Sequence, residues 1–118
     1  MSMLTTEEAF RRLTIGDTDL VDAMAVHDSS DLVAMRLDTR TEALLLVGAL
    51  IALDAPPSAY RTAVDTAMLA GATVDELLGV LVGVAGTVGS ARVLSAAPRI
   101  ALAAGYDVEA ALEDLRAG

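Results

Sequence analysis

The chain contains no cysteine, lysine, tryptophan, asparagine or glutamine, and aromatic residues make up only 3% of its 118 residues. The lack of cysteine excludes disulfides and thiolate chemistry, and the lack of lysine excludes a Schiff base. Because His27 is the single histidine, no metal site with several histidine ligands can form. The chain also has no Gly-x-Ser-x-Gly turn, so nothing supports a Ser-His-Asp triad that would use His27. We therefore expect neither a metal nor a cofactor. A chain without disulfides is compatible with the cytoplasm.

Positive charge is scarce, with 8 arginines against 17 acids and a formal net charge of −9. Residues 1–38 hold eight acids and three arginines (−5), residues 39–105 hold five and four (−1), and residues 106–118 hold four and one (−3). Acidic flanks repel nucleic-acid phosphates and anionic lipid, which argues against both partners. No signal peptide is expected, and no uncharged run reaches the ~20 residues of a membrane-spanning helix.

Hydrophobic residues are abundant, at 54%, and the mean hydropathy is +0.55. Their spacing and the capping residues between them predict an all-α fold with six to eight helices and no useful strand. The length predicts a single domain over residues 1–118. We divide it into an N-terminal helical arm (1–37), a core (38–105) and a C-terminal helix (106–118). Within the core, the pattern predicts helices over about 39–53, 57–70, 74–85 and 90–104. It also predicts a break or a close helix contact at Gly86 and Gly89, and a kink or a new helix start at Pro98.

Two of the predicted helices, over 39–53 and from Val74 to about Ala85, have apolar residues on almost every face. A helix that is apolar all round must be buried all round, and the remaining helices are short. The simplest solution is a homo-oligomer in which neighbouring subunits supply the cover. The alternative is a monomer whose own helices wrap the two central ones.

The segment from Ala67 to Leu77 has the order helix end, glycine stop, capping box and new helix start. With the segment Leu37–Leu44 before it and Gly86–Ala91 after it, this order resembles the carboxymuconolactone decarboxylase family, which includes the alkylhydroperoxidase D-like proteins. The resemblance covers residues 37–106. It implies helical protomers that assemble as trimers or hexamers, and a lyase or decarboxylase type of activity on a small metabolite.

The positions that hold the family's reactive residues have unreactive side chains in this chain. The family's histidine lies eight residues before the glycine, where this chain has Ala63. In the peroxidase branch two cysteines precede that histidine, at positions that hold Pro56 and Ala59 in this chain. Thiol peroxidase activity is therefore excluded, because no thiolate can form. The usual decarboxylase base is missing as well.

Four other side chains are candidates for a site in which different residues replace the family's histidine and cysteines. Two of them could transfer a proton. Glu42 lies near the family's glutamate at the start of the long helix, within a residue or two. In an apolar pocket it would be a general acid or base; otherwise it is a first-turn acid that suits the helix dipole. Tyr60 lies close to the empty histidine position and is the second candidate catalytic residue.

The other two candidates, Arg61 and Arg92, could bind the carboxylate of a small acidic metabolite through two parallel hydrogen bonds. Arg99 could join them. The alternative for each arginine is an ion pair with an acid at a subunit interface, or extension of the charged end into solvent. His27, at the end of a predicted helix, either interacts with the helix dipole or completes a neighbour's pocket.

Two functions are compatible with the sequence. The first is a cofactor-free, non-thiol enzyme of the lyase or decarboxylase type, with Arg61 or Arg92 holding a small carboxylate and Glu42 or Tyr60 moving a proton. The second is a non-catalytic oligomer that binds a ligand or a protein partner. Convergence of the four side chains on one cavity would favour the first.

Overall fold

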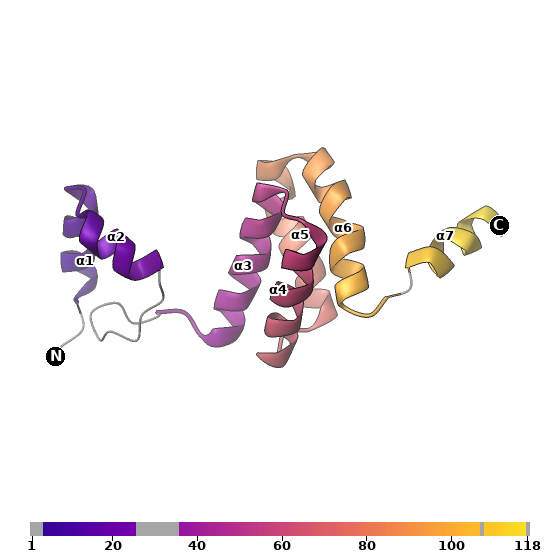
Figure 1. The fold of residues 1–118 in the computed structure, drawn as a ribbon, viewed down its shortest axis with the longest axis horizontal. Helices are drawn as coiled ribbons and strands as arrows, with labels where there is room; N and C mark the ends of the chain where they lie inside the picture. The colour runs from indigo at the N-terminus through magenta and orange to yellow at the C-terminus, as the bar shows by residue number, and fades with distance from the viewer. Residues whose placement is uncertain (1–3, 26–35, 107, 118) are drawn as a thin grey trace. The chain divides into compact units, whose positions relative to one another are not determined.

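A computed structural model of the chain describes residues 4–25, 36–106 and 108–117, and all the regular structure within them is helical. Seven helices lie in this part of the chain, which confirms the predicted all-α fold (Figure 1). They divide into two compact units, Met1–Arg36 and Leu37–Gly118. The division falls next to the expected end of the N-terminal arm. His27 lies outside the described residues.

The first unit contains α1 (Thr6–Thr14) and α2 (Thr18–Ala25), which pack against each other. The side chain of Thr5 accepts a hydrogen bond from the backbone N–H of Glu8 and so caps α1. Asp17 caps α2 through the N–H of Leu20 and also accepts from Arg12 at 2.6 Å. These two contacts lower the pKa of Asp17, the Arg12 hydrogen bond most of all. The capping residues, Thr5 and Asp17, are the ones that the sequence predicts.

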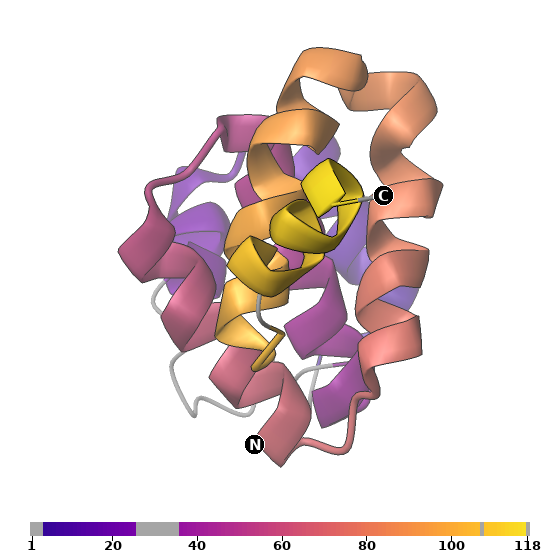
Figure 2. The same cartoon turned by 90° about the vertical axis from the view of Figure 1, so that its right-hand side faces the viewer.

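The second unit is built around four antiparallel helices: α3 (Thr39–Leu53), α4 (Pro57–Leu69), α5 (Val74–Val88) and α6 (Ser90–Ala103). Both α3 and α6 pack against α4 and α5, so α3 and α6 lie across the bundle from each other (Figures 1 and 2). The short loops 54–56 and Gly89 lie at one end of the bundle, and the loop 70–73 lies at the other (Figure 1). The last helix is α7 (Val108–Ala117).

Local capping residues fix where the bundle helices start. Asp38 accepts from the N–H of Thr41 at 2.7 Å and begins α3. Thr73 and Glu76 form a complete capping box at the start of α5, as the sequence predicts. Gly71 takes φ +97° at the end of α4, where a side chain would be strained.

The break expected at Gly86 and Gly89 falls at Gly89. The helix α5 continues through Gly86 to Val88 and ends at Gly89, where φ is +90°. The helix α6 continues through Pro98 to Ala103 as a single element. No new helix starts at Pro98, and Ala96 and Ile100 on either side of it are buried in the core.

The core of the bundle consists of aliphatic side chains and one tyrosine. The largest fully buried side chains are Tyr60, Ile51, Leu77, Val47 and Val64. Many alanines complete this cluster, which allows the helices to approach closely. Among the described residues, no helix is long and apolar enough to cross a membrane.

Candidate functional site

The candidate site residues lie at two ends of the bundle. Tyr60 and Arg61 are in the first turns of α4, and Arg92 is in the first turn of α6, so all three lie at the end with the loop 54–56 and Gly89. Glu42 is in the first turn of α3, at the other end (Figure 1). With a rise of 1.5 Å per residue, α3 carries Glu42 roughly 18 Å from Asp54 at the end of the same helix. The single chain therefore does not bring the four candidates together.

Tyr60 is a core residue. Its side chain is fully buried, with an exposed fraction of 0%, among the aliphatic residues of α3, α4 and α6. Its hydroxyl has no hydrogen-bond partner among the described residues. Burial raises the pKa of Tyr60; the positive charge of Arg99 opposes this rise, and the negative charge of Asp54 adds to it. The phenol therefore stays protonated at neutral pH.

Arg99 connects α6 to the turn between α3 and α4. Its Nη1 donates to the carbonyl oxygen of Ala55 at 2.7 Å and lies 3.9 Å from Oδ1 of Asp54. The hydroxyl of Ser95 donates to the same carboxylate at 3.0 Å. Asp54 adopts a left-handed conformation, with φ 52° and ψ 53°, to end α3. Arg99 therefore stabilises a turn within its own chain, a role that the sequence analysis did not predict.

Arg92 is exposed and borders a shallow depression at the start of α6. The depression has a volume of about 490 Å³, and its lining includes Asp54, Ser90 and Arg92. No side chain caps the N-terminus of α6, so backbone N–H groups are available there. A guanidinium beside free N–H groups suits an anion, whereas the carboxylate of Asp54 opposes one.

Arg61 and Glu42 lie on the outside of the bundle. Arg61 is exposed on α4, and no ion pair joins it to the described part of the chain. Glu42 is half-buried on α3, and it has a polar or charged partner. Glu76, which the sequence assigns to the capping box, also accepts from Arg40 at 2.6 Å. The hydrogen bond from the Thr73 backbone is the main cause that lowers the pKa of Glu76.

The position of the family histidine lies inside the core. Ala63 is only 4% exposed and packs in the same cluster as Val64 and Ala67. It belongs to the buried apolar cluster, whereas the adjacent polar residues of α4, Thr62 and Asp65, are exposed. A base placed there would be surrounded by hydrocarbon rather than by a polar site.

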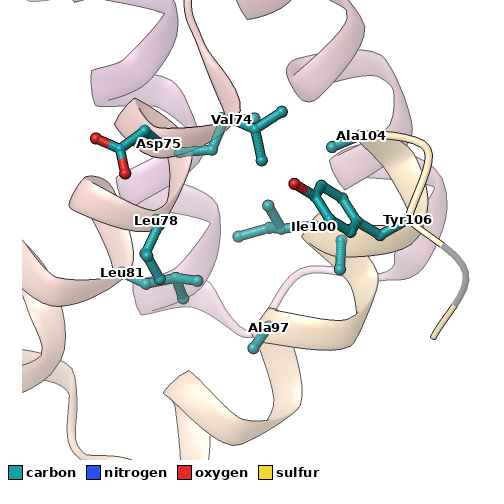
Figure 3. A pocket seen from close by; sticks show the side chains of 10 residues that line it. Val74, Asp75, Leu78, Leu81, Ala97, Ile100, Ala104 and Tyr106 are labelled. Carbon is teal, nitrogen blue, oxygen red and sulfur yellow. The ribbon is translucent and has the colours of Figure 1, made fainter. Parts of the chain in front are cut away.

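An apolar hollow lies between α5 and α6 (Figure 3). It has a volume of about 440 Å³ and is lined by side chains such as Val74, Leu78, Leu81 and Ile100. The hydroxyl of Tyr106 points across it, and the carboxylate of Asp75 points away from that hydroxyl (Figure 3). The hollow therefore offers hydrophobic contact without converging polar groups.

The outer surface of the bundle carries apolar side chains that the choice of single candidate residues missed. Large apolar side chains stand exposed on all four helices: Leu45, Leu46 and Leu53 on α3, Met68 and Leu69 at the C-terminal end of α4, Leu78 and Val82 on α5, and Leu94 and Leu102 on α6. Along the rest of α4, most outward positions are polar: Ser58, Arg61, Thr62, Asp65 and Thr66. The signal for this surface was present in the sequence as two helices without a polar face.

The fold and its surfaces define an all-helical protein whose central element is a four-helix bundle with apolar outer faces. No family model matches the chain, and neither a curated protein nor a solved structure matches it. Its function is therefore inferred from its own residues.

Proposed function

We propose that this chain is a self-associating helical protein of the carboxymuconolactone decarboxylase-like type that acts by binding rather than by catalysis. The observation that carries this proposal is the apolar outer surface of α3, α5 and α6. Leu45 is 62% exposed, Val82 70% and Leu94 73%. Exposed apolar surface that spans several helices is typical of a protein–protein interface.

The arrangement of the candidate site residues supports the same proposal. Tyr60 is in the core, Arg61 is on the polar outer side of α4, and Glu42 is at the far end of the bundle from Arg92. The position of the family histidine is filled by the buried Ala63. An active site needs groups held within hydrogen-bond reach of a common reacting atom.

The test is the mass of the full chain in solution, measured by sedimentation velocity and light scattering over a wide range of concentration. We expect an assembly larger than a monomer, a trimer or hexamer if the family resemblance holds, which dissociates only on strong dilution. A monomer at every concentration would contradict the proposal.

A second function is favoured by one observation, the depression at the start of α6. There Arg92 and the free N–H groups of the helix could hold the carboxylate of a small metabolite, as a lyase or decarboxylase would require. Glu42 would have to come from a neighbouring copy, because it lies at the other end of its own bundle.

This second function is tested by titrating small mono- and dicarboxylates into the full chain and by following release of CO₂. Binding that is lost in Arg92→Ala and kept in Arg61→Ala would support it, because both variants lose one exposed arginine near the same end of the bundle. Equal behaviour of the two variants would contradict it.

A further inference from the structure

The last helix, α7, is too short to be stable without packing. It has 10 residues, fewer than the roughly 12–15 below which an isolated helix is marginal in water. A helix of this length therefore depends on burying one of its sides. Among the described helices, however, α7 contacts α6 alone.

The side of α7 that suits burial is exposed. Leu112 and Leu115 are three residues apart and so lie on the same side of the helix, and they are 46% and 78% exposed. With about 100° of rotation per residue, the acids Glu113 and Asp114 fall on the other side, where they are exposed as well. The amphipathic pattern thus lacks a surface for its apolar side.

The hollow between α5 and α6 ends where α7 is attached. Gly105 has φ +95° after the end of α6, and the N–H of Tyr106 donates to the carbonyl oxygen of Ala101 at 2.9 Å. This glycine turn places Tyr106 in the lining of the hollow, with its hydroxyl pointing across it (Figure 3). The helix α7 begins two residues later.

The hollow also has the length and direction that α7 requires. Its lining runs from Val74 to Leu81 on α5 and from Ala97 to Ala104 on α6, so each helix contributes about 12 Å of length. The 10 residues of α7 extend about 15 Å. A helix that starts opposite Ala104 and runs antiparallel to α6 brings Leu115 opposite Ala97.

We propose that α7 folds back along this hollow as a strap, so that its two leucines pack between α5 and α6. The structure has the strap open, with both leucines exposed, and the proposed form is the closed one. The short connection keeps α7 at an effective concentration on the order of mM beside the hollow, which no separate partner of similar chemistry reaches. The strap belongs to one chain and does not rest on the self-association proposed above.

A second hollow touches the end of α6 but is less suitable for α7. It has a volume of about 520 Å³ and lies at the ends of α4 and α6, where its lining includes Asp65, Met68 and Leu69. The carboxylate of Asp65 would face a helix that itself carries Glu109, Glu113 and Asp114. The hollow between α5 and α6 has one acid in its lining, Asp75, whose carboxylate points away from Tyr106 (Figure 3).

Charge makes closing of the strap sensitive to salt. The closed form brings Glu109, in the first turn of α7, to the end of the bundle that carries Asp75, in the first turn of α5. These like charges oppose closing, whereas the antiparallel dipoles of α6 and α7 favour it. Screening of the repulsion by sodium chloride should therefore favour the closed strap.

The lack of cysteine allows a direct test by disulfide cross-linking, because two introduced thiols form the only possible pair within a chain. The test pair is Ala97→Cys with Leu115→Cys. The control pair is Leu69→Cys with Leu115→Cys, which reports on the second hollow at the end of α4. The full chain is oxidised at high dilution, and intrachain and interchain products are separated by mass on a non-reducing gel.

We expect the test pair to form an intrachain disulfide at least 10-fold faster than the control pair, because the bond requires Cα atoms within about 7 Å. Added sodium chloride should widen this difference. Circular dichroism checks that the bundle is folded in both variants.

A third substitution in the test pair separates packing of the strap from its random motion. Leu112→Glu keeps a good helix former in α7 but would place a carboxylate in the apolar hollow, so cross-linking should slow at least 10-fold. Ala117→Glu adds the same charge on the opposite side of α7 and should leave the rate nearly unchanged.

Each outcome either supports the strap or overturns it. Fast intrachain cross-linking of the test pair, slowed by Leu112→Glu and not by Ala117→Glu, supports it. Equal rates for the two pairs, or a faster control pair, overturn it. Disulfides that form mainly between chains also overturn it, since α7 would then occupy the hollow of a second copy. Self-association of the wild type is measured separately, so it can stand or fail independently of the strap.

Discussion

At the scale of single residues, Tyr60 gives the clearest prediction. Its hydroxyl is buried and has no hydrogen-bond partner among the residues that the structure describes. A buried polar group without a partner costs free energy that an apolar group of the same shape does not. We expect Tyr60→Phe to raise the free energy of unfolding by about 1 kcal/mol, because the ring stays and the unsatisfied oxygen goes. Urea denaturation followed by circular dichroism measures it.

Tyr106 supplies the control for this variant. It is 59% exposed, so its hydroxyl can bind water, and Tyr106→Phe should leave the free energy of unfolding nearly unchanged. A loss of stability in Tyr60→Phe, as large as a hydrogen bond is worth, would show that the Tyr60 hydroxyl has a partner in solution and would contradict the prediction.

The same hydroxyl sets a pH dependence at alkaline pH. Burial raises the pKa of Tyr60 in the folded chain above the ordinary value of 10.0, so the unfolded chain releases this proton first. The contribution of the protonated Tyr60 hydroxyl to the free energy of unfolding is complete below pH 10, and it is lost as the pH rises through the pKa of the folded state. As the pH rises above about 10, the wild type should therefore lose more stability than Tyr60→Phe. Parallel loss in both would show that other groups cause it.

At the scale of helices, the contact of α3 with α5 depends on Gly48. An added Cβ would meet Val80 and Val84 at ordinary contact distances of 3.5 and 3.6 Å. Gly48→Ala should therefore be accepted and should stabilise the chain by up to about 1 kcal/mol through helix propensity. Gly48→Leu should destabilise it by about 1–3 kcal/mol, because the larger side chain must push the two helices apart. Thermal and urea unfolding of both variants measure the difference.

The two Gly48 variants should thus change stability in opposite directions. A leucine at the exposed Thr62 of α4 controls for the effect of the residue type alone, and Thr62→Leu should change stability by less than either Gly48 variant. If Gly48→Ala were as destabilising as Gly48→Leu, the two helices would have to lie closer than the structure places them.

The starts of helices could be predicted from the sequence because capping is local. Asp38, Thr73 and Glu76 make the hydrogen bonds expected of them within three residues along the chain. The break expected at Gly86 and Gly89 falls at Gly89, and the choice between these two glycines is not local. Whether a glycine interrupts a helix depends on the packing of its neighbours, and Val84 and Val88 hold α5 against the core.

At the scale of the molecule, the sequence indicated the candidate residues but could not give their positions. Tyr60 and Arg61 are adjacent in the chain, yet one is in the core and the other is outside, since consecutive helical residues point about 100° apart. The turn that Arg99 stabilises is 44 residues away, so only the folded bundle reveals that contact. The prediction that two helices need cover on every side came from the sequence pattern, and the exposed leucines of α3 and α5 show which faces the helices of the bundle itself leave uncovered.

The charge of the whole chain gives the last prediction, which concerns how salt affects self-association. Each copy carries a formal net charge of −9, and the acids are concentrated in residues 1–38 and 106–118 rather than in the nearly neutral bundle. Copies that meet through the apolar faces of α3, α5 and α6 therefore bring like charges closer without burying ion pairs. Raising the ionic strength from about 0.01 M to about 1 M shortens the screening length from ~30 Å to ~3 Å, which removes that repulsion.

We therefore expect the dissociation constant of the assembly to fall as salt is added, by sedimentation velocity at matched protein concentrations. Sodium chloride is the suitable salt for the titration, because sulfate would also strengthen apolar burial directly. An interface held by ion pairs would respond in the opposite direction, since screening weakens attraction between opposite charges as well. Dissociation by salt would thus contradict the apolar interface, and it would direct attention to the exposed arginines Arg61 and Arg92 as partners for the acids of a neighbouring copy.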